Sequence, residues 1–241
     1  MGPSRLLELT LARRDALSDD DRHALHGIAV RKASFRDGET VIARGPTPEE
    51  SCLLVSGMAS RSHPAPDGAR VVTALHVPGD FVDLHGLLLE RLDHDIIAIG
   101  DVRVEFVPAE DLRRVSRTAP HLTRLLWLMT LIDASTHRAW IVARTSLDAR
   151  LRIGHLFSEL YVRLSAVGLV DNRSFAMPLG QKGLAEVLGY SAVHVNRAVQ
   201  ALRAENLLHW SGGTVRLPDP EALATICSFD PAYLEIERAP R

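Results

Sequence analysis

The sequence is short of cysteine and of long apolar runs, and both shortages narrow what the chain can be. Its two cysteines, Cys52 and Cys227, are too few and too far apart for a disulfide framework, a zinc site or a cysteine-ligated iron–sulfur cluster. We expect both thiols to be buried as small hydrophobic groups. The longest strongly apolar stretch begins at Leu125 and is far shorter than a membrane span, and no apolar leader follows a basic start. The sequence therefore predicts a soluble, cytoplasmic protein that does not bind membranes.

The chain also lacks catalytic signatures and a large charge of one sign. It has no nucleophile elbow, phosphate-binding glycine loop, H-E-x-x-H motif or pair of catalytic carboxylates, so we expect no enzymatic activity. Lys and Arg number 28 and Asp and Glu 30, a net charge of -2, which argues against a polycation that coats nucleic acid non-specifically. Hydrophobic residues make up 46% of the sequence, enough for packed cores in one large or two small domains.

One segment, from Pro178 to Leu208, has a strong pattern of two short helices around a tight turn. Gly189 permits the turn, and Ser191 is placed to cap the second helix. Apolar residues recur at helical spacing on both sides of the turn: Leu184, Val187, Leu188, Val195, Val199 and Leu202. A two-strand hairpin with a Gly-Gly turn is expected after it, between His209 and Leu217. An ordinary αα-hairpin shares some of these cues, but helix-turn-helix plus hairpin is typical of a DNA-binding winged helix.

Residues outside this apolar stripe are the expected DNA contacts. Base edges in the major groove would meet the start of the second helix, at Ala192, Val193, Asn196 and Arg197. Phosphate oxygens would be held near the two helix N-termini and along the second helix, by Gln181, Lys182, Ser191, His194 and Gln200. Arg197 is the expected reader, because its guanidinium can contact guanine O6 and N7 together.

Two different patterns precede this segment. Between Ala33 and Val107, glycines punctuate short β-rich runs, which predicts an antiparallel barrel or sandwich. Pro120 then opens a helical pattern that reaches about Thr145. We therefore expect an α+β protein in three parts: a sensor domain at residues 1–117, a central dimerisation helix at 118–145 and a winged-helix domain at 146–241.

The central helix has a seam with alternating steps of three and four residues, the spacing of a two-stranded coiled coil. The expected seam residues are Leu122, Leu125, Met129, Ile132, Thr136 and Ala139. The alternative is that this face packs against the chain's own β domain. We favour a homodimer, because one helix-turn-helix has little contact area on DNA and symmetric dimers are the usual solution.

Together these parts resemble the CRP/FNR family of bacterial transcription regulators along nearly the whole chain. GYSAVHVNRAVQALRAENLL, which begins at Gly189, resembles the family's turn and recognition helix. FRDGETVIARG, LLVSGMAS and VPGDFVDLHGLL resemble its cyclic-nucleotide-type β-roll, a double-stranded β-helix of the jelly-roll type. The resemblance implies a homodimer that binds double-stranded DNA at a near-palindromic operator and contacts RNA polymerase. Ala192 and Val193 stand where typical members have a basic or small residue and then Glu, so we expect a different operator sequence.

The resemblance also defines a candidate effector pocket, in which this chain departs from the cyclic-nucleotide members. Those members hold the ribose with a Glu and the cyclic phosphate with an Arg followed by Ser or Thr. An ungapped alignment places Leu84, His94 and Asp95 at these positions. An aspartate repels phosphate, and histidine is a weak substitute for an always-charged arginine. We therefore expect no cyclic nucleotide, although a register slip would let Asp83 act as the acid and Arg91 as the base.

On the central helix, His137 and Arg138 replace the small hydroxyl residues that meet the purine in cyclic-nucleotide members. With Trp140 they form either a pocket for another, unidentified small molecule or an internally packed cluster without a ligand. Some relatives bind haem in the β-roll, but no H-x-x-x-H or Cys/His pair here has ligand spacing, so the sequence predicts no metal, no haem and no certain cofactor. The candidate pocket residues are Asp83, Leu84, His85, Arg91, His94, Asp95, His137 and Arg138.

The leading interpretation is a homodimeric, sequence-specific transcription regulator that couples a sensor domain to a winged helix. The alternative is a small-molecule or haem sensor whose C-terminal domain contacts proteins, in which case Arg197 and Lys182 are solvated surface charges. Salt-dependent binding to a duplex distinguishes the two.

Overall fold

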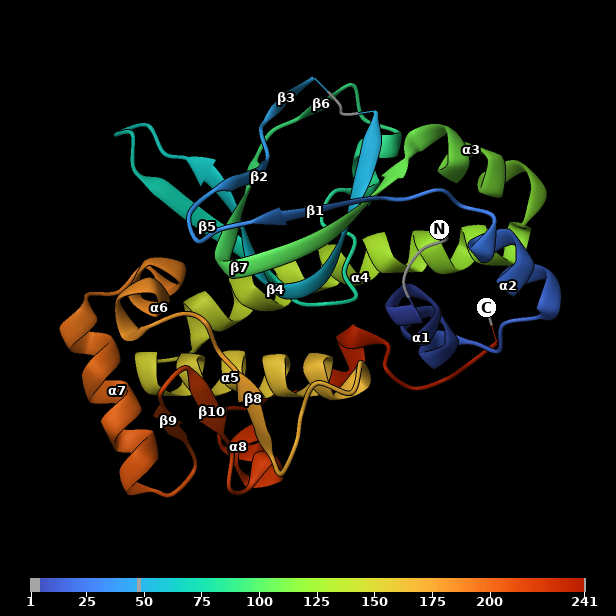
Figure 1. The fold of residues 1–241 in the computed structure, drawn as a ribbon. Helices are drawn as coiled ribbons and strands as arrows, with labels where there is room; N and C mark the ends of the chain where they lie inside the picture. The colour runs from blue at the N-terminus through green and yellow to red at the C-terminus, as the bar shows by residue number, and fades with distance from the viewer. Residues whose placement is uncertain (1–4, 47–48, 241) are drawn as a thin grey trace.

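Two layers make up the protein, and one long helix runs between them (Figure 1). The computed structural model describes residues 5–46 and 49–240. An antiparallel sheet domain forms the upper layer, and a helix-rich C-terminal head forms the lower one. The expected α+β fold is therefore confirmed, with an antiparallel β domain, a long central helix and a C-terminal helix-turn-helix. Within the two described ranges, no helix combines the length and the hydropathy that crossing a bilayer requires.

The β domain is built on two long antiparallel strands, β4 (Glu50–Pro64) and β7 (Asp95–Pro108). They pair from Glu50 opposite Pro108 to Ser62 opposite Asp95. The sheet order is β1-β7-β4-β5, β2 also pairs with β7, and β3 and β6 form a separate ribbon. The shorter elements are β1 (Arg31–Phe35), β2 (Thr40–Ile42), β3 (Gly45–Pro46), β5 (Arg70–His76), the 3-10 turn η1 (Leu84–Leu87) and β6 (Arg91–Leu92).

Two short helices, α1 (Arg5–Arg14) and α2 (Asp19–His26), pack beside the start of the long helix. Ser18 caps α2, because its hydroxyl accepts from the backbone N–H of Asp21 and the Asp21 carboxylate accepts from the N–H of Ser18. This reciprocal pair satisfies two amides that the helix itself leaves free. The buried leucines of α1 then share one core with those of the long helix.

The helix α3 (Ala109–Thr118) leads into the long helix α4 (Pro120–Ser146). The face of α4 with the predicted dimer seam is turned toward the chain's own domains, which corrects that prediction in favour of its alternative. Leu122, Leu125 and Thr136 are buried, Met129 and Ile132 line an internal cavity, and Ala139 is half-buried.

A second stripe runs along the exposed side of α4, and we call it the outward stripe. It consists of Trp127, Leu131, Ala134, Arg138 and Ile141, at alternating steps of four and three residues. Trp127, Leu131 and Ile141 are 65%, 51% and 63% exposed, unusually high for large apolar side chains. Two faces of one helix thus have coiled-coil spacing, and periodicity alone selected the face that the fold buries.

The head begins with α5 (Ala149–Ala166), capped by Asp148. Its helix-turn-helix consists of α6 (Gln181–Leu188) and α7 (Ala192–Ala204), and Gly189 between them has a φ of 69°, in the left-handed region that glycine adopts without strain. A three-stranded sheet of order β8-β10-β9 completes the winged helix. The remaining elements are β8 (Ser174–Ala176), β9 (His209–Ser211), β10 (Thr214–Arg216), α8 (Pro220–Ile226) and η2 (Pro231–Leu234).

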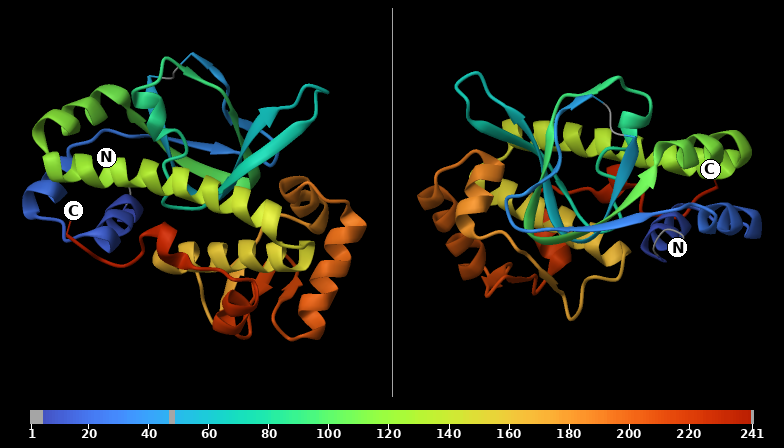
Figure 2. Two further views of the ribbon diagram at one scale, coloured as in Figure 1. Left: turned by 180° about the vertical axis from the view of Figure 1, so that it is seen from behind. Right: turned by 45° about the horizontal axis from the view of Figure 1, so that its top comes forward.

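The head packs on the sheet domain through α5, which runs beside α4 (Figure 2). Met58 and Ile99 of the sheet share a hydrophobic core with Leu160 of α5. Gly100 makes this approach close, since a Cβ added there would lie 2.9 Å from the Cβ of Pro178. Sensor and head therefore meet through a continuous core, and a change in one is felt by the other.

Candidate DNA interface and sensor cavity

The start of α7 is open to solvent, as a base-reading surface must be. The side chains of Val195, Val199 and Leu202 are buried beneath it and fix the helix to the head. The four predicted base-contact residues lie on the other side, and all are exposed: Ala192, Val193, Asn196 and Arg197. The structure thus brings the predicted base contacts together on one free face.

The predicted phosphate-contact residues surround the same end of the helix pair. Ser191 has the predicted capping role, since its Oγ accepts from the backbone N–H of His194 at 3.3 Å. The Asn196 Nδ2 donates to the Gln181 Oε1 at 2.9 Å, which uses one of its two N–H donors and leaves its Oδ1 free. Gln181 is half-buried, and the exposed members are Lys182, Ser191, His194 and Gln200.

Arg152 of α5 supports the turn of the helix-turn-helix from below. Its Nη1 donates to the carbonyl oxygen of Leu188 at 2.8 Å, and its guanidinium lies 5.3 Å from the ring centroid of Tyr190. A cation suits the last carbonyls of α6, where the helix dipole is negative. The sequence did not indicate this role of Arg152, because no local motif shows that a residue of one helix will hydrogen-bond to the C-terminal carbonyl of another.

A cavity of about 560 Å³ lies between the sheet domain and α4, and we call it the sensor cavity. Polar side chains from the sheet domain and α4 line the sensor cavity, and Arg152 of the head also lines it. The polar lining from the sheet domain and α4 includes Arg61, His63, His85, Asp93, His94, Asp133 and His137.

Arg61, in the middle of β4, is the buried cation of this cavity and is only 4% exposed. Its Nη1 donates to the Asp133 Oδ2 at 2.8 Å and lies 3.2 Å from the His137 Nε2, while its Nη2 donates to the carbonyl of Val82. The ion pair with Asp133 compensates the guanidinium charge, so little of it is left for an anionic ligand. Sequence analysis missed Arg61, because its partners come from distant segments.

The structure corrects the expected membership of the effector pocket. Of the eight predicted residues, His85, His94 and His137 line the sensor cavity. The other five do not line it: Leu84 is buried in the core, Arg91 and Arg138 are exposed, Asp95 accepts from the backbone N–H of Arg44, and Asp83 is buried beneath β4.

Asp83 holds the backbone rather than a ligand. Its Oδ1 accepts from the N–H of Cys52 at 2.7 Å and from the hydroxyl of Ser51 at 3.1 Å. Burial raises the pKa of Asp83 to about 7, although these hydrogen bonds oppose the shift. Cys52 beside it is buried and free, as is Cys227, which confirms the expectation for both thiols.

Three histidines that line the sensor cavity, His85, His94 and His137, have lowered pKa values. Burial lowers the pKa of His85 to about 4, and the charge of Arg61 adds to this effect. Burial also lowers the pKa of His94 and of His137. Neutral imidazoles have a free lone pair, so these rings can accept hydrogen bonds or bind cations.

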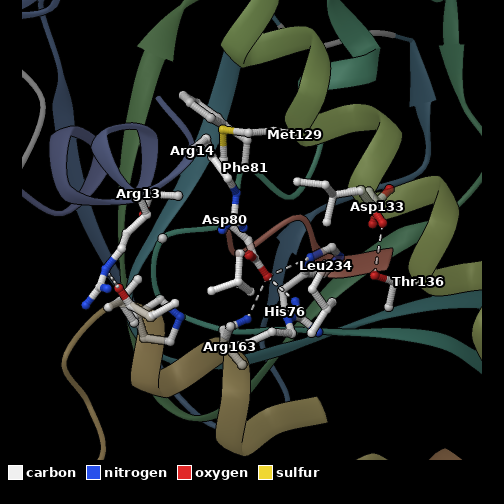
Figure 3. Close-up of a pocket in the computed structure, with 18 of the residues that line it drawn as sticks. Arg13, Arg14, His76, Asp80, Phe81, Met129, Asp133, Thr136, Arg163 and Leu234 are labelled. Carbon is white, nitrogen blue, oxygen red and sulfur yellow. Dashed lines mark hydrogen bonds and ion pairs between the residues drawn. The ribbon is translucent and has the colours of Figure 1, made fainter. Parts of the chain in front are cut away.

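A smaller cavity of about 60 Å³ lies where the sheet domain, α4 and α5 meet (Figure 3). Asp80 of the sheet domain and Arg163 of α5 form an ion pair at its wall, and His76 lies beside them. Burial alone would raise the pKa of Asp80, but the adjacent guanidinium outweighs it and lowers the pKa to about 2. This pair links sensor and head by charge as well as by packing.

The same arginine continues into a polar network around a fully buried carboxylate, that of Glu159. The Arg163 Nη1 donates to Glu159 at 2.9 Å, and Glu159 also accepts from the Trp140 Nε1 at 2.9 Å and the Tyr233 hydroxyl at 2.8 Å. Glu159 has no exposed surface, so these donors are what make its burial tolerable. Because Trp140 also lines the sensor cavity, the network joins the cavity wall to the head.

Comparison with known proteins identifies relatives for both halves of the chain. A family model described as a cyclic nucleotide-binding domain matches residues 32–119, and one described as a Crp-like helix-turn-helix domain matches residues 151–226. Transcriptional activator protein FnrL of Cereibacter sphaeroides is 26% identical over 182 residues, which cover 74% of this chain and 73% of the relative. Transcriptional activator protein FnrA of Stutzerimonas stutzeri is 26% identical over 212 residues, which cover 88% and 86%. The structure of FixK2 from Bradyrhizobium japonicum has the same fold, with a TM-score of 0.71 at 23% identity over 82% of this chain and 96% of that one.

Proposed function

The chain belongs to the CRP/FNR family and is a transcription regulator with a helix-turn-helix DNA-binding domain, and on that premise we propose how it reads and is controlled. Arg197 contacts a guanine in the major groove, and Ala192 and Val193 contact thymine methyl groups nearby. Asn196 reads an adenine with its amide, whose second N–H and Oδ1 are left free by the hydrogen bond to Gln181. The observation that carries this proposal is the exposed face at the start of α7, where Ala192, Val193, Asn196 and Arg197 lie together in solvent.

We propose that two copies pair along the outward stripe of α4. Trp127, Leu131 and Ile141 would lose most of their water-exposed apolar surface in such a coiled coil, which favours pairing. The pair would place two α7 helices on one side of a duplex, so the operator is near-palindromic. The domain limits expected from the sequence, at residues 117 and 145, fit this division into sensor, pairing helix and head.

The effector of the sensor cavity is, in this proposal, not a cyclic nucleotide. Arg61 is compensated by Asp133, and Asp93 adds a further carboxylate to the wall. Two carboxylates in the wall disfavour a phosphate, and Arg61, the buried cation of the wall, is already paired with one of them. Asp83, the acid that a register slip would offer to a ribose, is not in the wall and is bound to the backbone of β4.

Arg152 offers a physical route from cavity to DNA. It lines the sensor cavity and also donates to the carbonyl of Leu188 at the turn of the helix-turn-helix. A ligand that draws Arg152 toward the cavity would break its hydrogen bond to that carbonyl and change the position of α6 relative to α5. Such a ligand shifts DNA binding only by its differential affinity for the two arrangements.

Two relatives are named transcriptional activators, which supports a contact with RNA polymerase as part of this proposal. A regulator of transcription works where the DNA is, so we place the protein in the cytoplasm.

Selection of duplexes from a random pool, followed by affinity measurements at several salt concentrations, tests the head. Arg197→Ala should lose discrimination at one base pair per half-site, by about 1–3 kcal/mol. Lys182→Ala should weaken all duplexes alike and reduce the salt slope by about one unit, since it removes a phosphate contact. Arg117→Ala is the matched control, because this exposed arginine of α3 pairs with Glu110 far from the head.

An unchanged selected motif in Arg197→Ala would refute the base-reading assignment. Equal losses in the two head variants on every duplex would refute the division between base and phosphate contacts. A protein that binds no duplex at any salt concentration would favour the alternative, a sensor module whose C-terminal domain contacts proteins.

A further inference from the structure

Three side chains at one edge of the sensor cavity bring metal-ligand atoms together. His63 belongs to β4, and Asp93 and His94 directly precede β7. One ligand atom from each residue lies within 4.8 Å of the other two. The β4–β7 ladder explains why: Ser62 is opposite Asp95, so the next cross-strand position brings His63 beside His94. No spacing along one strand shows this, which is why the sequence predicted no metal site.

One of the two ring nitrogens of His94 lacks a hydrogen-bond partner among the described residues. Its Nδ1 lies 2.7 Å from the Asp93 Oδ1, and its Nε2 is closed to solvent with no hydrogen-bond partner among the described residues. A proton on Nδ1 leaves Nε2 as a buried acceptor without a donor. A proton on Nε2 leaves a donor unpaired and turns the Nδ1 lone pair toward a carboxylate. A cation bound to the ring resolves both cases, at a side chain that is only 2% exposed.

The donor set selects the class of cation. Two imidazoles and one carboxylate suit first-row transition metals such as Zn²⁺, Co²⁺, Ni²⁺ and Fe²⁺, whereas Mg²⁺ and Ca²⁺ prefer oxygen ligands throughout. Three protein ligands also leave coordination positions free toward the cavity. The nearest buried cation, Arg61, is paired with Asp133 and so repels a metal ion little.

We propose that His63, Asp93 and His94 bind a first-row divalent transition-metal ion, and that this ion is the effector of the sensor cavity. The first step stands on the sheet geometry alone. The second rests on the proposed function, because it requires a head that binds DNA. Binding of the ion would hold the edge of the cavity together, next to His85, whose ring centroid lies 5.2 Å from that of His94.

Titration of Co²⁺ into full-length protein freed of metal with a chelator tests the site, read by calorimetry and by the visible absorption of the bound ion. We expect one saturable equivalent. His63→Ala and Asp93→Asn, both at positions that are not fully buried, should each weaken the affinity at least ~10-fold. His121→Asn is the matched control, since that ring lies between the carboxylates of Asp15 and Asp21 on the N-terminal side of the molecule.

Each outcome decides the site. Unsaturable binding, or an affinity that both cavity variants leave unchanged, overturns it. Loss of the bound ion in His121→Asn alone places the ion at the other histidine and overturns it as well. Circular dichroism identifies a variant that has not folded. If either His63→Ala or Asp93→Asn fails to fold, the other variant decides whether the site binds the ion.

Duplex affinity with and without Zn²⁺ separates the two steps of the proposal. An affinity change of about threefold or more in the wild type that is absent from His63→Ala supports the ion as effector. An equal affinity with and without the ion overturns the effector step and leaves the site. A protein that titrates Co²⁺ but binds no duplex refutes the proposed function, not the metal site.

Discussion

The reading head and the sensor cavity are both clusters of polar side chains, but they are built in opposite ways. The polar residues of α7 come from one continuous segment and point into solvent. Those of the cavity come from β4, the turn before β7 and α4, and several are buried. Exposed groups are free to meet a partner, whereas buried ones must first satisfy one another. Substitutions in the head should therefore change binding, and substitutions in the buried part should change stability as well.

The largest expected effect comes from substitutions outside the head that prevent two chains from pairing. Leu131→Glu combined with Ile141→Glu places two carboxylates in the outward stripe and should convert the proposed dimer to monomers. Because two linked heads bind far more tightly than one, duplex affinity should fall by about 10²–10⁴-fold although no residue of the head has changed. Sedimentation velocity and fluorescence anisotropy with a labelled duplex measure the two effects.

Leu88→Glu is the control for this double variant. It makes the same kind of substitution, apolar to carboxylate, at a side chain of the sheet domain that is 90% exposed. It should leave both the sedimentation and the affinity unchanged. A double variant that still sediments as a dimer would show that the outward stripe is not the pairing surface.

A second substitution tests the cost of buried charge. Arg163→Met removes the partner of Asp80 and one donor to the fully buried Glu159, and we expect the protein to lose about 3–5 kcal/mol of unfolding free energy. Arg150→Met removes an arginine that pairs with the exposed Glu205 in the head, and the expected loss is about 0–1 kcal/mol. Urea unfolding followed by tryptophan fluorescence compares them. Similar losses would contradict the contrast between buried and exposed polar clusters.

The head was predictable from sequence because its determinants are local. Helical spacing fixed the buried side of α7, and Gly189 marked the turn, since its φ of 69° is one that other residues rarely adopt. Ser191 capped the helix that it was expected to cap. Each of these signals depends on residues within a few positions of one another.

The sensor cavity was not predictable in the same way, because its residues meet only through the sheet and the long helix. Arg61 is buried by an ion pair with Asp133 in a different element. His63 and His94 become neighbours through the β4–β7 register. The seam on α4 failed for another reason: the sequence has coiled-coil spacing on two faces, and only tertiary packing decides which one is buried. The helix α1 carried no signal strong enough to be predicted.

The smallest expected effect concerns His121, which contacts Asp21 and Asp15 outside both clusters. The hydrogen bond with Asp21 raises the pKa of His121 despite partial burial, and the bond with Asp15 acts in the same direction. A raised folded-state pKa gives stability that is fully present below the unfolded value of 6.5 and is lost as the pH rises through the folded value.

Raising the pH from about 6 to about 8 should therefore cost wild type up to about 1 kcal/mol of unfolding free energy relative to His121→Asn, because the His121 side chain is 22% exposed and solvent screens part of the interaction. The comparison must be a difference between the two proteins, because the buried cavity histidines have lowered pKa values and stabilise the fold as the pH rises over the same range. The pH dependence of stability therefore has opposite signs in the two regions. Protonation of His121 stabilises the folded protein, whereas protonation of the buried cavity histidines destabilises it. Parallel pH profiles of the unfolding midpoint in both proteins would show that His121 contributes nothing to the difference.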